Sequence, residues 1–417
     1  MATWMVQVSL ILICSVVLGR LAERVGQSRM VGEVGTGLLL GASVLGVLWP
    51  EGHAALFFTD SLEDLKVFAD LGLVLLMFEV AWHTSSLHAE KVRNAILTPL
   101  VITLFGVSLT FLIGCLIAAV SKENIAPDIA FWPYVFFCGL ALSATALPVL
   151  IRIIARLKNI SASTASIALS SAVYTDVFAW IGVAFLVASY AAGKTSILGA
   201  LISTLALIGF CGISFYLIRP LISLLYRERQ AKRNNGIQLI VVVCYCLASA
   251  EITSQLGFHQ AIGVVIAAYV FCKVPGLQHI WRRTIGSFAH IFFIPIFFAY
   301  SGLQVSVGYF SQFDTWLWLG VFSVGGFLGK VVGTYLGGRI CGLSPTIAME
   351  VGLLMNTKGL VELVILSIGL QLGALSEKAY GIFLIIALLS IVMTPPLLTL
   401  FAKLCRRNAD VQIKVAK

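Results

Sequence analysis

Charged residues are scarce in this chain of 417 residues. Asp, Glu, Lys and Arg make up 11% of it, against about 25% in a typical soluble domain. Hydrophobic residues make up 59%, and the mean hydropathy is +0.99. The longest polar stretch is the tail 405–417, which leaves no room for a soluble catalytic domain. The sequence therefore predicts an all-α membrane protein that crosses the bilayer many times.

Motifs of several other protein classes are also missing. The nine cysteines and six histidines lack metal-site spacing, and no His-Glu-x-x-His, Gly-x-Ser-x-Gly or phosphate-binding loop occurs. We therefore expect no enzymatic activity, no cofactor and no structural disulfide. Lys and Arg exceed Asp and Glu by 28 to 19. This excess does not indicate nucleic-acid binding, because the basic residues lie in short loops between apolar runs.

Thirteen apolar runs are long enough to be membrane spans. They are approximately residues 4–19, 28–49, 64–82, 94–120, 131–157, 163–191, 195–225, 236–252, 257–274, 286–305, 314–340, 346–371 and 379–403. The loops after odd-numbered runs, with the tail, hold 22 Lys and Arg, whereas the loops after even-numbered runs hold 4. This asymmetry predicts an N-terminus outside and a C-terminus in the cytoplasm, in a plasma (inner) membrane. Residues 1–404 form the predicted membrane domain, and 405–417 form a short cytoplasmic basic tail.

Two isolated charges of opposite sign interrupt long apolar runs. Asp176 lies near the middle of run 163–191, and Lys358 lies near the middle of run 346–371. A charge at the centre of a membrane helix costs about 2.5–3.5 kcal/mol on insertion scales. Charges retained at that cost indicate a function inside the membrane.

Two of the runs contain residues that interrupt helices. Run 131–157 includes Pro148, and run 346–371 includes Gly359 after three polar residues. Interrupted helices are tolerated in membranes where the freed backbone lines a cavity or protein. The two runs cross the membrane in opposite directions, which predicts an inverted repeat with a core formed by 94–191 and 314–403. The alternative is that these residues are the ordinary Pro and Gly of membrane helices.

Five segments together resemble the monovalent cation:proton antiporter superfamily, on its Kef-type and Nap-type branch, close to the plant cation/proton exchangers. They are residues 31–41 (VGEVGTGLLLG), 75–80 (LLMFEV), 143–150 (SATALPVL), 173–180 (VYTDVFAW) and 352–363 (GLLMNTKGLVEL). The last segment is the nearest to the plant exchangers. The resemblance extends from about residue 10 to 403.

The resemblance implies an inverted-repeat antiporter fold with two discontinuous helices that cross near Thr145 and Asn356. It also implies a homodimer, in which the helices outside the core form the dimerisation scaffold. The ion-binding aspartate of the family corresponds to Asp176, and its core lysine corresponds to Lys358. Electrogenic members have Asp-Asp where this chain has Thr175 followed by Asp176.

The buried carboxylate of Asp176 can hold either a proton or a metal cation such as Na⁺ or K⁺. The alternative is a structural ion pair. Lys358 could neutralise Asp176 when no cation is bound, or serve as a purely structural counter-charge, and both interpretations predict a contact between the two. Glu362 follows Lys358 by four residues and so shares its helix face. It could orient the lysine or bind the ion directly.

Several other residues are candidates for supporting roles. The hydroxyls of Thr175, Ser171 and Thr145 offer oxygen ligands, although each is also an ordinary helix-packing residue. Asn356 and Thr357 could instead cap the helix ends at the second break. The remaining two candidates are charged: Lys330 could be structural or functional, and Glu79 could line a solvated funnel or simply end a helix.

These features favour a secondary active antiporter that exchanges H⁺ for Na⁺ or K⁺ by alternating access. Because Thr175 replaces a second carboxylate, the expected exchange is electroneutral. Two alternatives remain open on the same fold, a channel-like cation conductor and an organic-solute transporter.

Overall fold

The computed structural model describes residues 4–57, 59–87, 97–157, 160–192, 197–229, 235–256, 258, 260–272, 274, 276–305 and 307–415. In this part of the chain every regular element is helical. The α-helices are α1 (Trp4–Arg24), α2 (Arg29–Leu40), α3 (Leu45–Leu48), α4 (Pro50–Leu56), α5 (Thr59–Leu87), α6 (Leu97–Ile125), α7 (Phe131–Ser143), α8 (Leu147–Arg156), α9 (Ala162–Ala192), α10 (Ile197–Ile213), α11 (Arg219–Arg229), α12 (Asn235–Gln255), α13 (Gln260–Phe271), α14 (Leu277–Trp281), α15 (Ser287–Ile291), α16 (Phe293–Leu303), α17 (Phe313–Ile340), α18 (Pro345–Met355), α19 (Leu360–Gln371) and α20 (Glu377–Val415). Short π-helical turns η1 (Ser214–Ile218) and η2 (Arg282–Gly286) and a 3₁₀ turn η3 (Val307–Ser311) connect some of them.

The chain forms two compact units. The first unit comprises Met1–Leu21, Gly32–Lys91 and Val183–Gln304, and the second comprises Ala22–Val31, Val92–Gly182 and Val305–Lys417. The second unit holds both predicted interruptions, so it is described first below.

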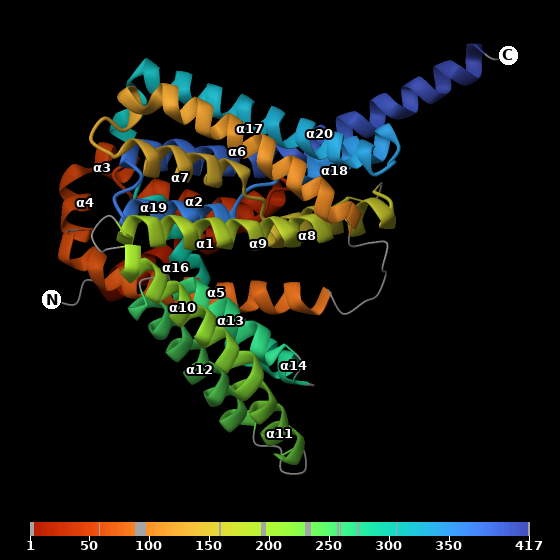
Figure 1. Cartoon of the computed structure of the whole chain (residues 1–417). Helices are drawn as coiled ribbons and strands as arrows, with labels where there is room; N and C mark the ends of the chain where they lie inside the picture. The colour runs from red at the N-terminus through yellow and green to blue at the C-terminus, as the bar shows by residue number, and fades with distance from the viewer. Residues whose placement is uncertain are drawn as a thin grey trace. The chain divides into compact units, whose positions relative to one another are not determined.

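Glycines bring α6 and α17 of the second unit into backbone contact, and the two helices run side by side (Figure 1). A Cβ atom at Gly333 would lie 2.6 Å from the carbonyl oxygen of Phe105, and one at Gly337 would lie 2.9 Å from Cα of Ile102. Small residues allow such close approach in membranes, where dispersion contacts between helices replace the hydrophobic effect. The glycines of α17 therefore hold it flat against α6.

The two predicted helix interruptions are present, as expected from their sequences. The first separates α7 from α8, with Ala144–Ala146 extended between them and Pro148 in the first turn of α8, where its missing N–H costs nothing. The second separates α18 from α19 at Asn356–Gly359. The prediction of two discontinuous helices is therefore confirmed.

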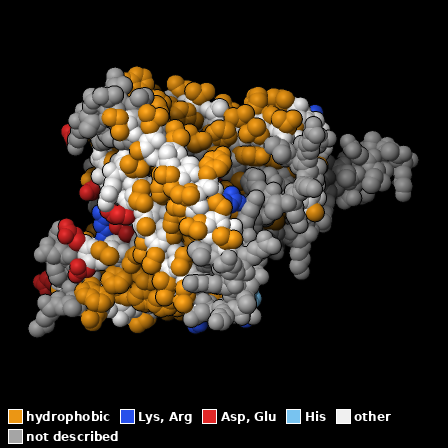
Figure 2. All heavy atoms as spheres, turned by 60° about the horizontal axis from the view of Figure 1, so that its bottom comes forward, with side chains coloured by type: hydrophobic (Ala, Val, Ile, Leu, Met, Phe, Trp, Pro, Cys, Tyr) orange, Lys and Arg blue, Asp and Glu red, His pale blue; other side chains and the backbone are white. Residues whose placement is uncertain are grey.

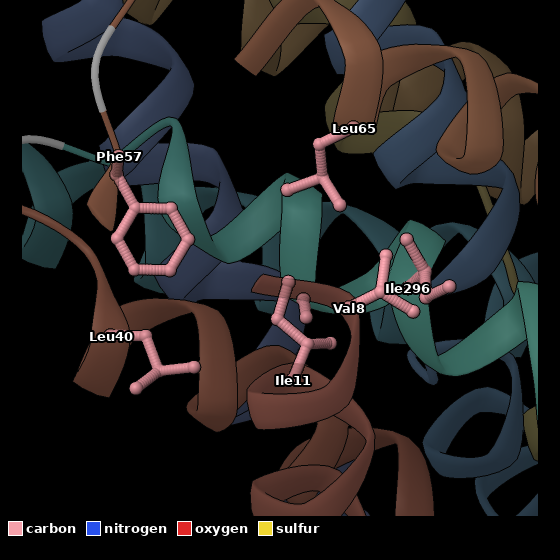
Figure 3. Close-up of a cluster of buried hydrophobic side chains, with 7 residues drawn as sticks. Val8, Ile11, Leu40, Phe57, Leu65 and Ile296 are labelled. Atoms are coloured by element: carbon pink, nitrogen blue, oxygen red, sulfur yellow. The ribbon is translucent and has the colours of Figure 1, made fainter. Parts of the chain in front are cut away.

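The first unit has a separate hydrophobic core, shown in Figure 3. Val8 and Ile11 of α1 pack with Leu40, Leu65 and Ile296, which come from α2, α5 and α16. Most of these side chains are almost fully buried. Helices from the beginning of the chain and α16 thus share one apolar cluster.

Nine helical segments in the described residues are long and apolar enough to cross a membrane. The predicted runs 131–157 and 346–371 are divided into shorter helices, and 257–274 contains the 12-residue α13. Run 64–82 lies within the 29-residue α5, which carries several charges in its first half. All thirteen predicted runs contain helix, but the number of thirteen spans stays a prediction. Hydrophobic side chains cover much of the face in Figure 2, as expected for contact with lipid.

Candidate ion-binding site

The two helix interruptions are bonded directly to each other. The backbone N–H of Ala146 donates to the carbonyl of Thr357 over 2.9 Å, and the hydroxyl of Thr145 donates to the carbonyl of Met355 over 2.9 Å. Each bond occupies a backbone carbonyl that a continuous helix would have used itself. The discontinuous helices therefore cross at these residues, as predicted for Thr145 and its partner segment.

Gly359 is required at the second interruption. Its φ of +150° is disfavoured for residues with a side chain. A Cβ atom there would also lie 3.2 Å from Cγ2 of Val149 and 3.3 Å from Cβ of Ala146. Backbone conformation and limited space thus both favour glycine at position 359.

Two buried lysines converge on the last turn of α7. Nζ of Lys330 donates to the carbonyl of Ser143 over 2.6 Å. Nζ of Lys358 donates to the carbonyl of Leu142 and, over 3.4 Å, to that of Ala141. The C-terminal carbonyls of a helix lack intrahelical partners and carry partial negative charge, which favours cations there. The end of α7 therefore stabilises both ammonium groups.

Lys358 also pairs with Glu362, as their four-residue spacing predicted. Nζ of Lys358 is 3.8 Å from Oε1 of Glu362, and both side chains are buried. Neither oxygen of Glu362 accepts a hydrogen bond from the described residues. The carboxylate lies in the first turn of α19, where the helix dipole favours negative charge.

Asp176 lies on α9 with only 6% of its surface exposed, and its Oδ1 has no hydrogen-bond partner in the described part of the chain. The predicted contact between Asp176 and Lys358 is wrong, because Lys358 pairs with Glu362 instead. Asp176 forms no salt bridge with the described residues, and the charge of Lys330 acts on it from beyond ion-pair distance. A buried carboxylate with an unfilled oxygen can accept a proton or a desolvated cation.

The candidate hydroxyls on α9 are engaged in helix packing. Oγ1 of Thr175 donates to the carbonyl of Ser171 over 3.0 Å, and Oγ of Ser171 donates to the carbonyl of Pro99 over 3.4 Å. The carbonyl of Ser171 also accepts the hydroxyl of Thr103 over 2.9 Å. These bonds use the hydroxyl protons, so the oxygens keep lone pairs for a cation. Ligation by Thr175 and Ser171 stays a prediction.

The polar residues of the second interruption are buried as well. Asn356 is the C-terminal cap of α18, and the hydroxyl of Thr357 has no hydrogen-bond partner among the described residues. Oγ of Ser390 accepts the backbone N–H of Lys358 over 3.0 Å, a contact that the sequence analysis missed. No motif distinguishes Ser390 from other serines in apolar runs, so only the fold reveals it.

Glu79 belongs to the first unit, whereas the residues described above belong to the second. Its Oε2 is 2.8 Å from Nε2 of His290, and its side chain is 23% exposed. The contact is compatible with either of the predicted roles of Glu79. Both therefore stay predictions.

The family model for the transmembrane sodium/hydrogen exchanger matches residues 9–403. The chain belongs to this family. It is 30% identical to Cation/H(+) antiporter 17 of Arabidopsis thaliana, over 94% of this chain and 47% of that protein. It is 29% identical to the Na(+)/H(+) antiporter NhaS4 of Synechocystis, over 91% of this chain and 92% of that protein.

A solved exchanger structure shares the fold. The sodium proton antiporter MjNhaP1 from Methanocaldococcus jannaschii superposes with a TM-score of 0.64 at 16% identity, over 96% of this chain and 97% of that one. This exchanger-family chain spans about half the length of the plant relatives it matches. The inverted-repeat antiporter fold expected from the sequence is thereby confirmed.

Proposed function

We propose that this chain is a secondary active antiporter that exchanges H⁺ for Na⁺ or K⁺ by alternating access. The observation that carries the proposal is Asp176, a buried carboxylate whose Oδ1 has no hydrogen-bond partner among the described residues. A proton and an alkali cation compete for this carboxylate. Competition at one site suffices to couple the two fluxes in opposite directions.

The remaining oxygen ligands come from neighbouring residues of the same unit. Thr175 and Ser171 offer hydroxyl oxygens, and the free hydroxyl of Thr357 offers another. Lys330 repels an incoming cation and attracts the empty carboxylate, so it keeps Asp176 neutralised until a cation or proton arrives. Lys358 has its own counter-charge in Glu362 and is a positioning residue for the end of α7.

The exchange is electroneutral in this proposal. Asp176 offers a single negative charge, because threonine occupies position 175. The carrier therefore has the same charge whether it holds one proton or one monovalent cation. In proteoliposomes, turnover should be independent of an imposed membrane potential, and a rate that follows the potential would contradict this stoichiometry.

The membrane arrangement follows from the charge asymmetry of the loops. The N-terminus lies outside and the C-terminus lies in the cytoplasm, in a plasma or inner membrane, because most loop Lys and Arg fall on one side. The protein is a homodimer in which the first unit provides the scaffold and the second unit carries the ion. The division of the chain into two compact units supports these separate roles.

The test is dye-quench antiport in everted vesicles from a strain that lacks its own antiporters. Asp176→Asn should reduce exchange of Na⁺, K⁺ and Li⁺ to the vector background. Asp128→Asn is the matched control, since Asp128 is exposed in the same unit and should retain at least about half of the native rate. Native-like exchange by Asp176→Asn, or cation flux without proton movement, would overturn the proposal.

A further inference from the structure

The first unit contains a recess that the transport site does not use. It is lined by Glu79 and Trp82 of α5, by Gln278 and Trp281 of α14, and by Arg282, the first residue of the π-helical turn η2. The recess has a volume of about 250 Å³ including its open mouth. All five residues belong to the first unit.

Three polar groups in this recess have no partner that the rest of the described chain supplies. The guanidinium of Arg282 and the amide of Gln278 make no hydrogen bond or ion pair with the described residues. The indole N–H of Trp281 is buried and likewise lacks an acceptor there. Only the indole N–H is a buried donor without an acceptor, while the half-buried amide of Gln278 and the exposed guanidinium of Arg282 are open to solvent. The donors together suit a ligand with acceptor oxygens.

The recess also contains a negative charge on one side. One oxygen of Glu79 contacts His290, and no described residue donates to the other. Trp82 and Trp281 stand beside it with their ring centroids 6.3 Å apart. A carboxylate next to indole rings favours an ammonium group. The recess therefore offers separate places for a positive and a negative group of one ligand.

Exposed apolar and basic residues adjoin the recess. Phe288 and Ile291 of α15 are exposed one to three turns beyond Arg282, and Arg283 is exposed beside it. Tryptophan and arginine concentrate where a membrane protein meets the headgroup layer. Acyl chains can lie along the exposed apolar residues while the headgroup occupies the recess.

We propose that this recess binds the headgroup of a zwitterionic phospholipid of the phosphoethanolamine type. The ammonium of the headgroup donates to Glu79, and the phosphate accepts from Arg282, Gln278 and the indole of Trp281. An anionic lipid lacks the ammonium and meets the repulsion of Glu79. A phosphocholine headgroup has no N–H to donate to the carboxylate.

The test is native mass spectrometry of the delipidated full-length chain, titrated with phosphatidylethanolamine, phosphatidylcholine or phosphatidylglycerol. The ethanolamine lipid should bind at least about tenfold more tightly than the other two, the scale of one charge-assisted hydrogen bond. Equal binding of phosphatidylglycerol would show that the recess recognises only the phosphate. Equal binding of phosphatidylcholine would show that no N–H of the headgroup donates to Glu79. Either result overturns the proposal.

Variants distinguish specific binding in the recess from nonspecific binding of lipid elsewhere on the protein. Arg282→Ala should weaken phosphatidylethanolamine binding about tenfold. Arg283→Ala removes an equal charge from a neighbouring exposed residue that does not line the recess, so it should change binding less than about twofold. Glu79→Gln keeps the shape of the side chain and should remove the preference over phosphatidylglycerol. Equal losses for the two arginine variants, or an unchanged preference in Glu79→Gln, would contradict the site. The readout is binding, so it is independent of whether the chain exchanges ions.

Discussion

The backbone N–H of Ala146 and the carbonyl of Thr357 form a 2.9 Å hydrogen bond between the two helix interruptions. Each interruption thereby satisfies a polar group that the other one exposes. A change at one interruption must disturb the other, since neither has a continuous helix to return to. The crossing is thus a single structural unit, although its halves are far apart in the sequence.

Thr145→Val should destabilise this crossing. Valine keeps the shape of threonine but cannot donate to the buried carbonyl of Met355, and an unsatisfied buried carbonyl costs about 1–3 kcal/mol. We expect a lower Tm in detergent and slower exchange, while Thr145→Ser should retain both. Thr399→Val is a suitable control, because the bond from Thr399 to Pro395 is exposed and local. A Tm for Thr145→Val equal to that of the control would contradict the role of the bond.

Glu362→Gln should lower the free energy of unfolding by about 3–5 kcal/mol. The substitution leaves the buried ammonium of Lys358 without its counter-charge, and an unpaired buried charge is costly. Chemical denaturation in detergent, with the melting temperature as a second readout, measures the loss.

The double variant Lys358→Met/Glu362→Leu provides the matching control. Removing both charges leaves no unpaired ion, so at least about half of the stability lost in Glu362→Gln should return. The two substitutions would then be strongly non-additive. Additive losses would mean that the 3.8 Å pair contributes little to the folded state.

Gly333→Ala should disrupt the packing of α17 on α6, because its new Cβ would lie 2.6 Å from a backbone oxygen. Gly320→Ala is the control on the same helix, since a Cβ there meets no heavy atom within 4 Å. Alanine favours helix over glycine by about 1 kcal/mol, so the control should be neutral or stabilising. Opposite changes in Tm would confirm the contact, and equal changes would refute it.

Acidification should weaken the apparent affinity for the cation if proton and cation compete at Asp176. On the acid side of the Asp176 pKa, apparent KM should rise about tenfold per pH unit, and on the alkaline side it should be constant. The maximal rate at saturating cation should change less than KM. A KM that does not vary with pH while the maximal rate falls would indicate a proton site elsewhere.

The sequence was sufficient to predict the interrupted helices. Pro148 lacks a backbone donor, and Gly359 follows polar residues in an apolar run, so both positions conflict locally with continuous helix. The pairing of Lys358 with Glu362 was equally local, because residues four apart lie on one helix face. Helix interruptions and pairs four residues apart depend on residues that are close in the sequence, so they can be predicted from it.

The lysine whose charge acts on Asp176 could not be predicted in this way. Both Lys330 and Lys358 lie at a plausible depth, and the choice between them depends on how helices distant in sequence pack together. The end of α7 binds both lysines, but Glu362 pairs with Lys358 alone, so the charge of Lys330 is the one that acts on Asp176. Every residue has a backbone carbonyl, so the sequence does not indicate which carbonyls accept hydrogen bonds from the two lysines. Only the fold shows these bonds.

The convergence of two ammonium groups on α7 constrains biogenesis. Lys330 and Lys358 bind carbonyls of α7 that precede them in the chain by 187 and 216 residues. When each lysine first enters the bilayer, its acceptors must already be within reach, or the segment must wait in a hydrated place. By either route the two lysines reach their final positions late in synthesis, after α7 and the second half of the chain have come together.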